Sequence, residues 1–227
     1  MPAQSEHPPI RTYKPRRGRI TARQARTLDA RHPRLLPADA PIDLAALFGD
    51  LPVICEIGFG TGVTTALMAR DRPDLAFLAI DVHTPGVGDL VARIDEDGLT
   101  NLCVIEGDAI AVLRDCIDAG ALAGVRSFFP DPWPKARHHK RRLVQHERIQ
   151  LIASRVRAGG TWDLATDWAP YAEHIEAQMA LEPQWQGGCV PRPDWRPVTH
   201  YESLGLEQGR AIRDFRYVRT QVPHTTI

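Results

Sequence analysis

Short apolar segments alternate with segments of helical periodicity between residues 51 and 181, and this alternation constrains the fold more than any other feature of the chain. Strands are predicted at residues 52–57, 76–81, 101–105, 125–129 and 161–166. Helices are predicted at residues 62–70, 87–97, 109–117 and 171–181, and from about Arg142, with Ile149, Ile152 and Val156 on one face, to Gly159 and Gly160. Such alternation predicts an α/β protein with a mostly parallel sheet and helices on both faces.

The C-terminal part departs from this alternation. Residues 184–190 and 214–220 have the composition of strands, and we predict no helix between them. They are expected to form an antiparallel hairpin at the edge of the sheet, which then has seven strands. The connection at residues 191–209 is long, and a loop of that length in a compact domain is usually functional or disordered.

The first 40 residues are rich in proline and arginine, and we expect a partly ordered basic arm at residues 1–40 before a domain at residues 41–227. Only residues 20–28 could form a short helix in this arm, with Thr21 as its cap. Residues 11–34 carry nine lysine and arginine residues against one acid, Asp29. A disordered basic tail and a nucleic-acid-binding arm explain this run equally well.

The composition fits one buried α/β domain with an appendage, since the chain has 227 residues and 43% of them are hydrophobic. The formal net charge is zero, so only clustered cations argue for nucleic acid. Cys55, Cys103, Cys116 and Cys189 are far apart and are expected to be reduced core thiols, not disulfides or zinc ligands. No apolar run approaches the roughly 20 residues that span a bilayer, and no signal-peptide core is visible, so a cytoplasmic protein is predicted.

A glycine-rich turn follows the first predicted strand, in the run CEIGFGTG. Glu56 precedes Gly58, Gly60 and Gly62 there. Glycines in a strand-to-helix turn let a ligand approach the backbone. A dinucleotide-binding turn would have the spacing G-x-G-x-x-G, whereas this turn has G-x-G-x-G after an acid. An acid repels a pyrophosphate but suits a cationic amine, so the turn favours S-adenosylmethionine as the cofactor.

Two more acids lie at the ends of the next strands. Asp81 ends the second strand, where it would accept hydrogen bonds from the ribose hydroxyls. Asp108 follows the third strand and would contact the adenine or orient its loop, although it could equally cap the helix that begins at Ala109. Nicotinamide-dependent enzymes share an acid at the second strand, but Glu56, Asp81 and Asp108 together favour a methyltransferase.

The run SFFPDPWPKARHHKRRL, at residues 127–143, places an acid between prolines and in front of a basic segment. Pro130, Pro132 and Pro134 fix φ and withhold backbone donors, so Asp131 is expected on a stiff turn at the carboxyl end of a strand. Trp133 is a candidate stacking face, and an anionic substrate that carries a base would suit the segment. The cations and histidines that follow are Lys135, Arg137, His138, His139, Lys140, Arg141 and Arg142. The alternative is a solvated loop and the start of a basic helix.

With these motifs the chain resembles the bacterial tRNA (guanine-N7)-methyltransferase family. The resemblance covers residues 18–219, and PDPWPKARHHKRR is its most specific motif; EIGFGTG, AIDVH, PGVG, ATDWAPYAEHI and RPVTHYESLGLEQG also match. It implies a Rossmann-like class I methyltransferase with a seven-stranded sheet. The implied reaction is methyl transfer from S-adenosylmethionine, without a metal, to N7 of a variable-loop guanosine at position 46 of tRNA, with S-adenosylhomocysteine as product.

The resemblance also implies roles for single residues. The acids expected to contact S-adenosylmethionine are Glu56, Asp81, Asp108 and Asp131, together with the backbone at Gly58 and Gly60, and Asp131 is also the expected catalytic residue. The residues expected to contact the substrate are Lys135, Asp167, Thr199, His200, Tyr201 and Glu202. Two positions depart from the family, which commonly has Glu where this chain has Asp81 and Lys where it has His200, so an imidazole replaces the fixed charge of a lysine at residue 200.

Guanine N7 carries a lone pair and no proton, so its methylation needs no general base. The site must orient the base, and a carboxylate can accept from the N1 and N2 donors of guanine. Asp131 and Asp167 are the candidates, with Glu202 as a third, although Asp167 could equally cap the helix near Trp168. Phosphate contacts are expected from Arg137, Lys140, Arg141 and Arg142, beside Lys135. The two histidines are assigned to the same RNA face and not to a metal.

Three other functions compete with this interpretation. A methyltransferase of the same fold that acts on a small molecule or protein would not need the basic segment beside Asp131. A non-catalytic RNA-binding module would not need the cofactor acids, and a nicotinamide-dependent oxidoreductase is disfavoured by the glycine spacing. The expected partner is tRNA, with no membrane and no obligate protein partner, and the protein is expected to be a monomer or homodimer.

Overall fold

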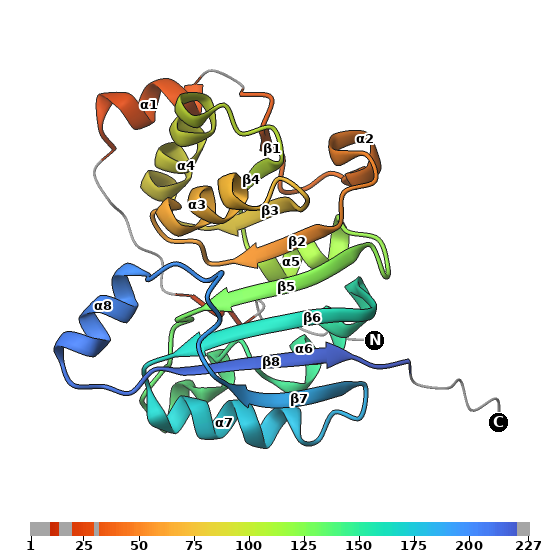
Figure 1. The fold of residues 1–227 in the computed structure, drawn as a ribbon, viewed down its shortest axis with the longest axis vertical. Helices are drawn as coiled ribbons and strands as arrows, with labels where there is room; N and C mark the ends of the chain where they lie inside the picture. The colour runs from red at the N-terminus through yellow and green to blue at the C-terminus, as the bar shows by residue number, and fades with distance from the viewer. Residues whose placement is uncertain (1–9, 14–19, 30–31, 222–227) are drawn as a thin grey trace, which may run out of the picture.

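The computed structural model describes residues 10–13, 20–29 and 32–221, and all structural statements refer to these residues. Eight strands form one sheet in the order β1-β4-β3-β2-β5-β6-β8-β7 (Figure 1). The strands are β1 (Leu35–Leu36), β2 (Val53–Ile57), β3 (Ala76–Asp81), β4 (Leu102–Glu106), β5 (Leu122–Phe128), β6 (Val156–Thr166), β7 (Trp185–Val190) and β8 (Arg213–Arg219). Neighbouring strands from β1 to β6 are parallel, whereas β8 is antiparallel to both β6 and β7. The mostly parallel α/β sheet and its antiparallel edge hairpin are therefore confirmed.

The sheet has one strand more than the seven predicted. The additional strand is β1, in which Leu35 and Leu36 pair with Val104 and Ile105 of β4. Two residues are too few to show an apolar period, so no sequence pattern predicts this strand. Part of the predicted arm thus joins the sheet, while the division of the chain at residue 40 stays a prediction.

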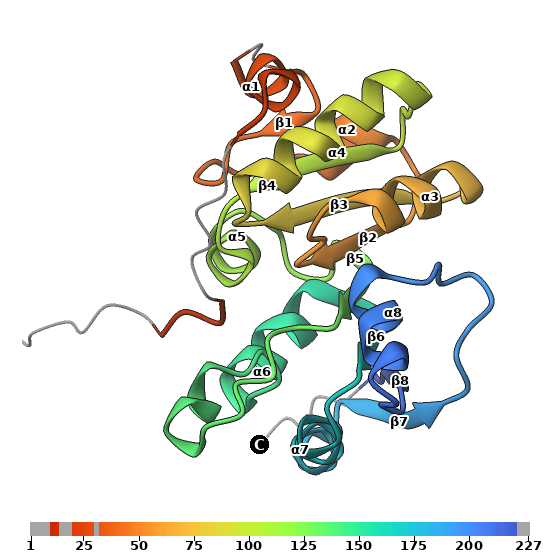
Figure 2. The same cartoon turned by 90° about the vertical axis from the view of Figure 1, so that its left-hand side faces the viewer.

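Helices cover both faces of the sheet, as Figure 2 shows from the side. The helices are α1 (Ala22–Asp29), α2 (Leu44–Phe48), α3 (Val63–Asp71), α4 (Thr84–Asp97), α5 (Ala109–Asp115), α6 (His146–Arg155), α7 (Ala169–Met179) and α8 (His200–Glu207), and η1 (Ala136–Arg141) is a 3-10 helix. One apolar cluster joins the sheet to α3 and α4, and the other joins it to α2, α5, α6 and α7. In β2, β3 and β4 alternate residues supply the two clusters, which is why these strands are continuous apolar runs in the sequence.

The predicted helix from about Arg142 to Gly159 begins later and ends earlier than expected. It is α6, and the next residue, Val156, has extended backbone angles and begins β6. Val156 pairs with Leu122, and the register between β5 and β6 then shifts before Gly124 pairs with Thr161. Val156 is buried as expected for the apolar face, but it is buried in the sheet, because pairing with β5 outweighs the helical pattern.

The connection between β7 and β8 contains a helix, α8, which contradicts the prediction that no helix lies there. Thr199 caps this helix: its hydroxyl accepts from the backbone N–H of Glu202, and the Glu202 carboxylate accepts from the backbone N–H of Thr199. The sequence Thr-x-x-Glu is the signature of such a capping box, so a signal for α8 was present. The surface of α8 carries few apolar residues that repeat at helical spacing, which hid it.

Near the N-terminus, the short helix predicted at residues 20–28 is α1, and Thr21 caps it as expected through reciprocal bonds with Gln24. The helix packs on α4 at Gly88, where a Cβ would lie 2.9 Å from the Cβ of Gln24. The guanidinium of Arg23 pairs with Asp89 and Glu96 of α4. Arg23 therefore binds the protein itself, while Lys14, Arg16, Arg17, Arg19 and Arg31 of the basic run lie outside the described residues.

All four cysteines are free, in agreement with the predicted reduced thiols. Cys55, Cys103 and Cys116 are buried in the core as expected. Cys189 is exposed, because it lies in β7, at the edge of the sheet, and the expectation of a core position was wrong for it.

Candidate active site

The acids selected from the sequence lie at one edge of the sheet. Glu56 and Asp81 lie at the carboxyl ends of β2 and β3, and Asp108, Asp131 and Asp167 follow β4, β5 and β6. These strands are parallel neighbours, so their carboxyl ends meet at the same edge. Open α/β sheets bind ligands there, and the structure brings the predicted cofactor and substrate acids together.

The glycine-rich turn after β2 leaves space beside its backbone. Gly58, Gly60 and Gly62 have φ values of 79°, 64° and 72°, which favour glycine. A Cβ on Gly58 or Gly60 would meet no atom within 4 Å, so the turn faces open space. On its other side the turn is tightly packed: a Cβ on Gly86, in the PGVG run, would lie 1.8 Å from the carbonyl oxygen of Gly60. The turn is therefore held from one side and open to a ligand on the other.

Asp81 ties this turn to the end of β3. One carboxylate oxygen accepts from the backbone N–H of Gly60 at 2.7 Å, and the other accepts from the backbone N–H of His83 at 2.9 Å. Burial raises the pKa of Asp81, and these backbone hydrogen bonds oppose the rise. Each oxygen keeps a further lone pair, so Asp81 can hold the turn and still accept from a ribose hydroxyl.

Glu56 is a buried acid with one oxygen that lacks a hydrogen-bond partner. Its side chain is 2% exposed, and its Oε2 atom has no hydrogen-bond partner among the described residues. Burial is the main reason that the pKa of Glu56 is raised to about 7. A buried carboxylate oxygen without a donor fits a ligand that brings its own cation, as the amine of S-adenosylmethionine does.

Asp108 caps α5, as the alternative interpretation predicted. Its Oδ1 atom accepts from the backbone N–H of Ile110 at 2.9 Å, at the start of that helix. The cap leaves the other oxygen available, so a contact with the adenine stays a prediction.

The turn that carries Asp131 has strained backbone on both sides. Phe129 and Trp133 have φ values of 53° and 45°, in the left-handed region that bulky residues rarely adopt. Such conformations cluster at functional sites, where the surrounding structure enforces them. The prolines at residues 130 and 132 fix φ beside Asp131, so its position is set by the backbone itself.

Trp133 is buried, which overturns its prediction as a stacking face for a base. Its side chain is 4% exposed, and its indole N–H donates to the carbonyl of Thr12 at 2.9 Å. The guanidinium of Arg141 lies 5.0 Å from the ring centroid. Trp133 therefore anchors the Asp131 turn to the described part of the N-terminal arm.

The basic segment divides into surface and buried cations. Lys135, Arg137 and Lys140 are exposed on and beside η1, and Arg141 is half-buried against Trp133.

Arg142, by contrast, is 3% exposed, and its Nε atom donates to the carbonyl of Pro132 at 3.0 Å. Burial lowers the pKa of Arg142. The expected phosphate contact of Arg142 is thus corrected, because its guanidinium lies inside the protein and holds the Asp131 turn.

Asp167 lies against α8. A Cβ on Gly205 of that helix would lie 3.1 Å from its Oδ2 atom, and Arg210 forms an ion pair with the same oxygen. The N-cap of α7 is Trp168, whose N–H donates to the hydroxyl of Thr166. The alternative in which Asp167 caps this helix is therefore wrong.

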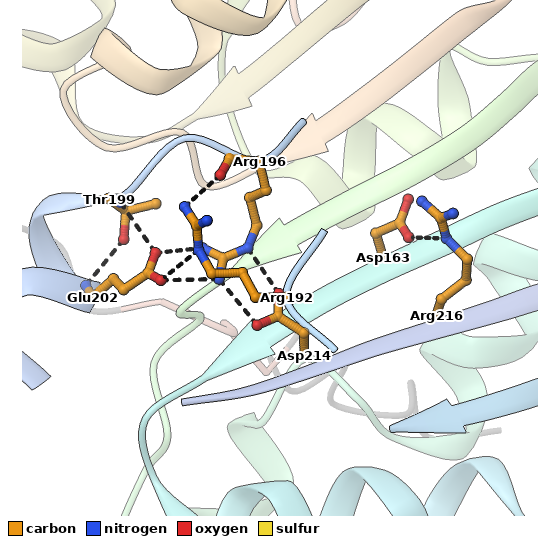
Figure 3. A network of polar contacts seen from close by, with 7 residues as sticks. All are labelled: Asp163, Arg192, Arg196, Thr199, Glu202, Asp214 and Arg216. Carbon is orange, nitrogen blue, oxygen red and sulfur yellow. Dashed lines mark hydrogen bonds and ion pairs between the residues drawn. The ribbon is translucent and has the colours of Figure 1, made fainter. Parts of the chain in front are cut away.

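A buried ion cluster holds α8 on the sheet (Figure 3). The Arg196 guanidinium binds Glu202 at 2.5 Å and Asp214 at 2.7 Å, and Arg192 binds Glu202 at 2.9 Å. Burial opposes ionisation of Glu202, but the hydrogen bonds and charges of Arg196 and Arg192 outweigh it and lower the pKa. We call Arg192, Arg196, Glu202 and Asp214 the ion cluster.

The four residues at 199–202, which were predicted to contact the substrate, divide into two that cap α8 and two that are exposed. Thr199 and Glu202 cap α8, and Glu202 is buried, so their contacts are made within the protein. The direct contact of Glu202 with guanine is corrected, because each of its two oxygens already accepts two hydrogen bonds, from Arg196, Arg192 and the backbone N–H of Thr199. His200 and Tyr201 are exposed and lie on the same helix as Gly205, where an added Cβ would meet Asp167.

Two arginines were missed in the sequence. Arg196 organises the ion cluster, and Arg126 lies beside Glu56 in the sheet. The signal for Arg126 was a charged residue in the middle of an apolar strand, where charges are rare. Within the described ranges, no three His, Cys, Asp or Glu residues are grouped so that they could hold a metal ion, and none of the helices is long and apolar enough to cross a membrane.

A family model and the solved structures show the general class to which this protein belongs. The family model described as "Putative methyltransferase" matches residues 50–215. The 16S rRNA methyltransferase KamB has a similar fold, with a TM-score of 0.58 and 16% identity over 78% of this chain and 91% of that one. The chain is a methyltransferase of this fold.

Relatives with similar sequences identify the family within this class. A tRNA (guanine-N(7)-)-methyltransferase from Streptomyces avermitilis is 47% identical, over 93% of this chain and 76% of the relative. Another, from Nitrosomonas europaea, is 43% identical, over 95% of this chain and 99% of the relative. The chain belongs to the tRNA (guanine-N(7)-)-methyltransferase family.

Proposed function

We propose that this protein transfers the methyl group of S-adenosylmethionine to N7 of a variable-loop guanosine, at position 46, in tRNA. The observation that carries the proposal is the edge of the sheet, which holds a buried acid with one unpartnered oxygen, an open glycine turn and the strained turn of Asp131. Exposed cations flank the same turn. The relatives from Streptomyces avermitilis and Nitrosomonas europaea are named for this activity.

The cofactor site is proposed at the ends of β2, β3 and β4. Glu56 would bind the amine, Gly58 and Gly60 would allow close approach, and Asp81 would accept from the ribose. Asp108 would lie near the adenine while it caps α5. S-adenosylmethionine supplies an activated methyl group on a sulfonium, and no metal is required, because N7 already carries the attacking lone pair.

The substrate site is proposed between the Asp131 turn and α8. Asp131 would accept hydrogen bonds from guanine, and its carboxylate would stabilise the positive charge that the purine gains. Asp167 would share its oxygens between Arg210 and the substrate. His200 and Tyr201 would contact the nucleotide from α8, which the ion cluster holds in position. No residue has to remove a proton from N7.

The RNA backbone is proposed to lie along η1. Lys135, Arg137, Lys140 and Arg141 would contact phosphates, and the N-terminal arm would extend this surface. In support of this, Thr12 accepts from Trp133 and Ile10 accepts from Arg148, so the described start of the arm lies beside the turn. We place the protein in the cytoplasm, where its tRNA substrate is found, and its state as a monomer or homodimer stays a prediction.

The test is transfer of labelled methyl from S-adenosylmethionine to unmodified tRNA, followed by borohydride and aniline, which cleave at N7-methylguanosine. Cleavage at a single variable-loop guanosine is the expected result. Labelled tRNA that resists cleavage would refute N7 as the target. No transfer to tRNA by protein that binds the cofactor would refute tRNA as the substrate. An Asp131→Asn variant that binds tRNA should lose most of the turnover.

A further inference from the structure

Four charged side chains form a row across neighbouring strands of the sheet, and one end of the row is at the proposed cofactor site. Glu56, Arg126, Asp163 and Arg216 are register neighbours on β2, β5, β6 and β8, so they project from one face and alternate in sign. We call them the charge row. At its outer end, Arg216 donates to Asp163 at 2.6 Å, as Figure 3 shows. The inner end of the row is Glu56, the proposed ligand of the cofactor amine.

Arg126 lies in the middle of the row and is buried. It is 4% exposed, and its Nε atom has no hydrogen-bond partner among the described residues. Its guanidinium stacks at 4.0 Å on the ring of Trp195 and lies 5.3 Å from the ring of Phe77. Burial lowers the pKa of Arg126 to about 10, so the side chain still carries its charge at neutral pH.

A buried charge needs an opposite charge, and the row offers Arg126 two carboxylates. Asp163 already accepts from Arg216 and from the hydroxyl of Thr161. Glu56 lies opposite Arg126 in the strand register and has an oxygen without a hydrogen-bond partner. Glu56 is therefore the carboxylate whose charge is left for Arg126 to balance. The attraction acts through the protein interior, where solvent screens it little.

We propose that Arg126 is a positioning residue of the cofactor site: its buried guanidinium keeps the Glu56 carboxylate ionised, and so ready for the cationic amine of S-adenosylmethionine. The inference rests on the proposed function, because Glu56 requires its charge only if it binds that amine. Arg126 itself does not touch the cofactor or the reacting atoms.

Two groups around Glu56 favour its carboxylate, and Arg126 is the one that carries a charge. Burial favours the neutral acid, and so does Asp81, which faces Glu56 from β3. The hydroxyl of Thr65 on α3 and the guanidinium of Arg126 on β5 favour the carboxylate. Trp195 covers the guanidinium and belongs to the connection that carries α8, so the segment that presents the substrate helix also keeps water from Arg126.

The experiment measures the dissociation constant of S-adenosylhomocysteine, which has the same amine, by calorimetry between pH 6 and 8.5. For the wild-type protein, binding should weaken as the pH falls through about 7, where Glu56 takes up a proton. In Arg126→Met the midpoint should rise by one pH unit or more. At pH 7 the ionised fraction then falls from about half to about a tenth, and the dissociation constant rises about fivefold. The difference from wild type should shrink toward pH 8.5.

Two further variants separate this role from a structural one. Glu56→Gln should bind weakly at every pH, and adding Arg126→Met to it should change binding no further, because the effect of Arg126 passes through Glu56. Arg213→Met is the matched control, since Arg213 lies on β8 and pairs at the surface with Glu176; it should keep the wild-type midpoint.

The proposal is overturned if Arg126→Met weakens binding by the same factor at every pH, or weakens Glu56→Gln as much as it weakens the wild type. Should Arg126→Met fail to fold, Arg126→Gln is compared with Arg126→Lys, which retains the cation; equal midpoints would overturn the proposal. These results are distinct from failure of the proposed function, in which the wild-type protein itself would neither bind S-adenosylhomocysteine nor methylate tRNA.

Discussion

The ion cluster makes a strong prediction for the variant Arg196→Met. The Arg196 side chain is fully buried, and it binds two carboxylates, Glu202 and Asp214, that are themselves 3% and 4% exposed. Four hydrogen bonds join the three side chains. Methionine fills a similar volume but carries no charge, so both carboxylates lose this partner. Arg192 still binds Glu202 at 2.9 Å, while Asp214 keeps no ion pair within the cluster.

The expected loss is large, because a buried charge without its partner costs about 3–5 kcal/mol of the free energy of unfolding. For a chain of this size that corresponds to a fall in Tm of roughly 10 °C. The assay is urea unfolding followed by tryptophan fluorescence and circular dichroism, with both signals required to coincide. The double variant Arg196→Met/Asp214→Asn should regain part of the loss, since it removes the uncompensated charge.

Arg213→Met is again the control. Its surface pair with Glu176 spans 3.4 Å, and both side chains are 43% exposed, so the loss should be within about 1 kcal/mol. The reasoning is refuted if Arg196→Met is no less stable than this control. It is also refuted if the added Asp214→Asn substitution destabilises Arg196→Met further, since the damage would then come from lost packing and not from a stranded charge.

Three further predictions concern the cofactor edge and the RNA face. The pKa of Glu56 is raised from 4.5 to about 7, so the free energy of unfolding of the cofactor-free protein should fall by roughly 3 kcal/mol as the pH rises from 4.5 through 7, and urea titrations should find this dependence absent in Glu56→Gln. Gly86→Ala should weaken cofactor binding at least tenfold in calorimetry, because its Cβ would displace the Gly60 turn; binding like wild type would show that the turn adapts. Arg137→Ala should lower the slope of log tRNA affinity against log salt concentration by about one, while the melting temperature changes little. Arg142→Ala should mainly lower the melting temperature, because this side chain is buried. The reverse pattern would contradict the assignment of surface and buried cations.

Much of the fold was predictable because its signals are local. The strands at β2, β3 and β5 each show a short apolar run, and the adjoining glycines and prolines mark where the runs end. Parallel pairing follows from the alternation with helices, and it places the acids after each strand at one edge. The acids of the cofactor site could therefore be named before their neighbours were known. The helix α8 was missed although its capping box was visible, because its apolar period is weak.

The roles of single charged and aromatic residues were less predictable, because burial is decided by distant parts of the chain. The basic run around Trp133 predicts a surface aromatic residue. Its indole N–H instead donates to the carbonyl of Thr12, 121 residues away in the chain. Arg142 has the same character as its exposed neighbours and differs only in what packs around it.

The α/β class, the order of the strands along the chain, the glycine turn and the acids at the strand ends are predictable from the sequence, since these depend on periodicity and on residues close in the chain. Which polar side chains are bonded within the protein, as Glu202 is, and which face the site depends on the folded structure. The folded structure also sets Arg126 beside Glu56, because the pairing of β2 with β5 joins residues 70 positions apart, and no local pattern encodes the neighbour across a sheet.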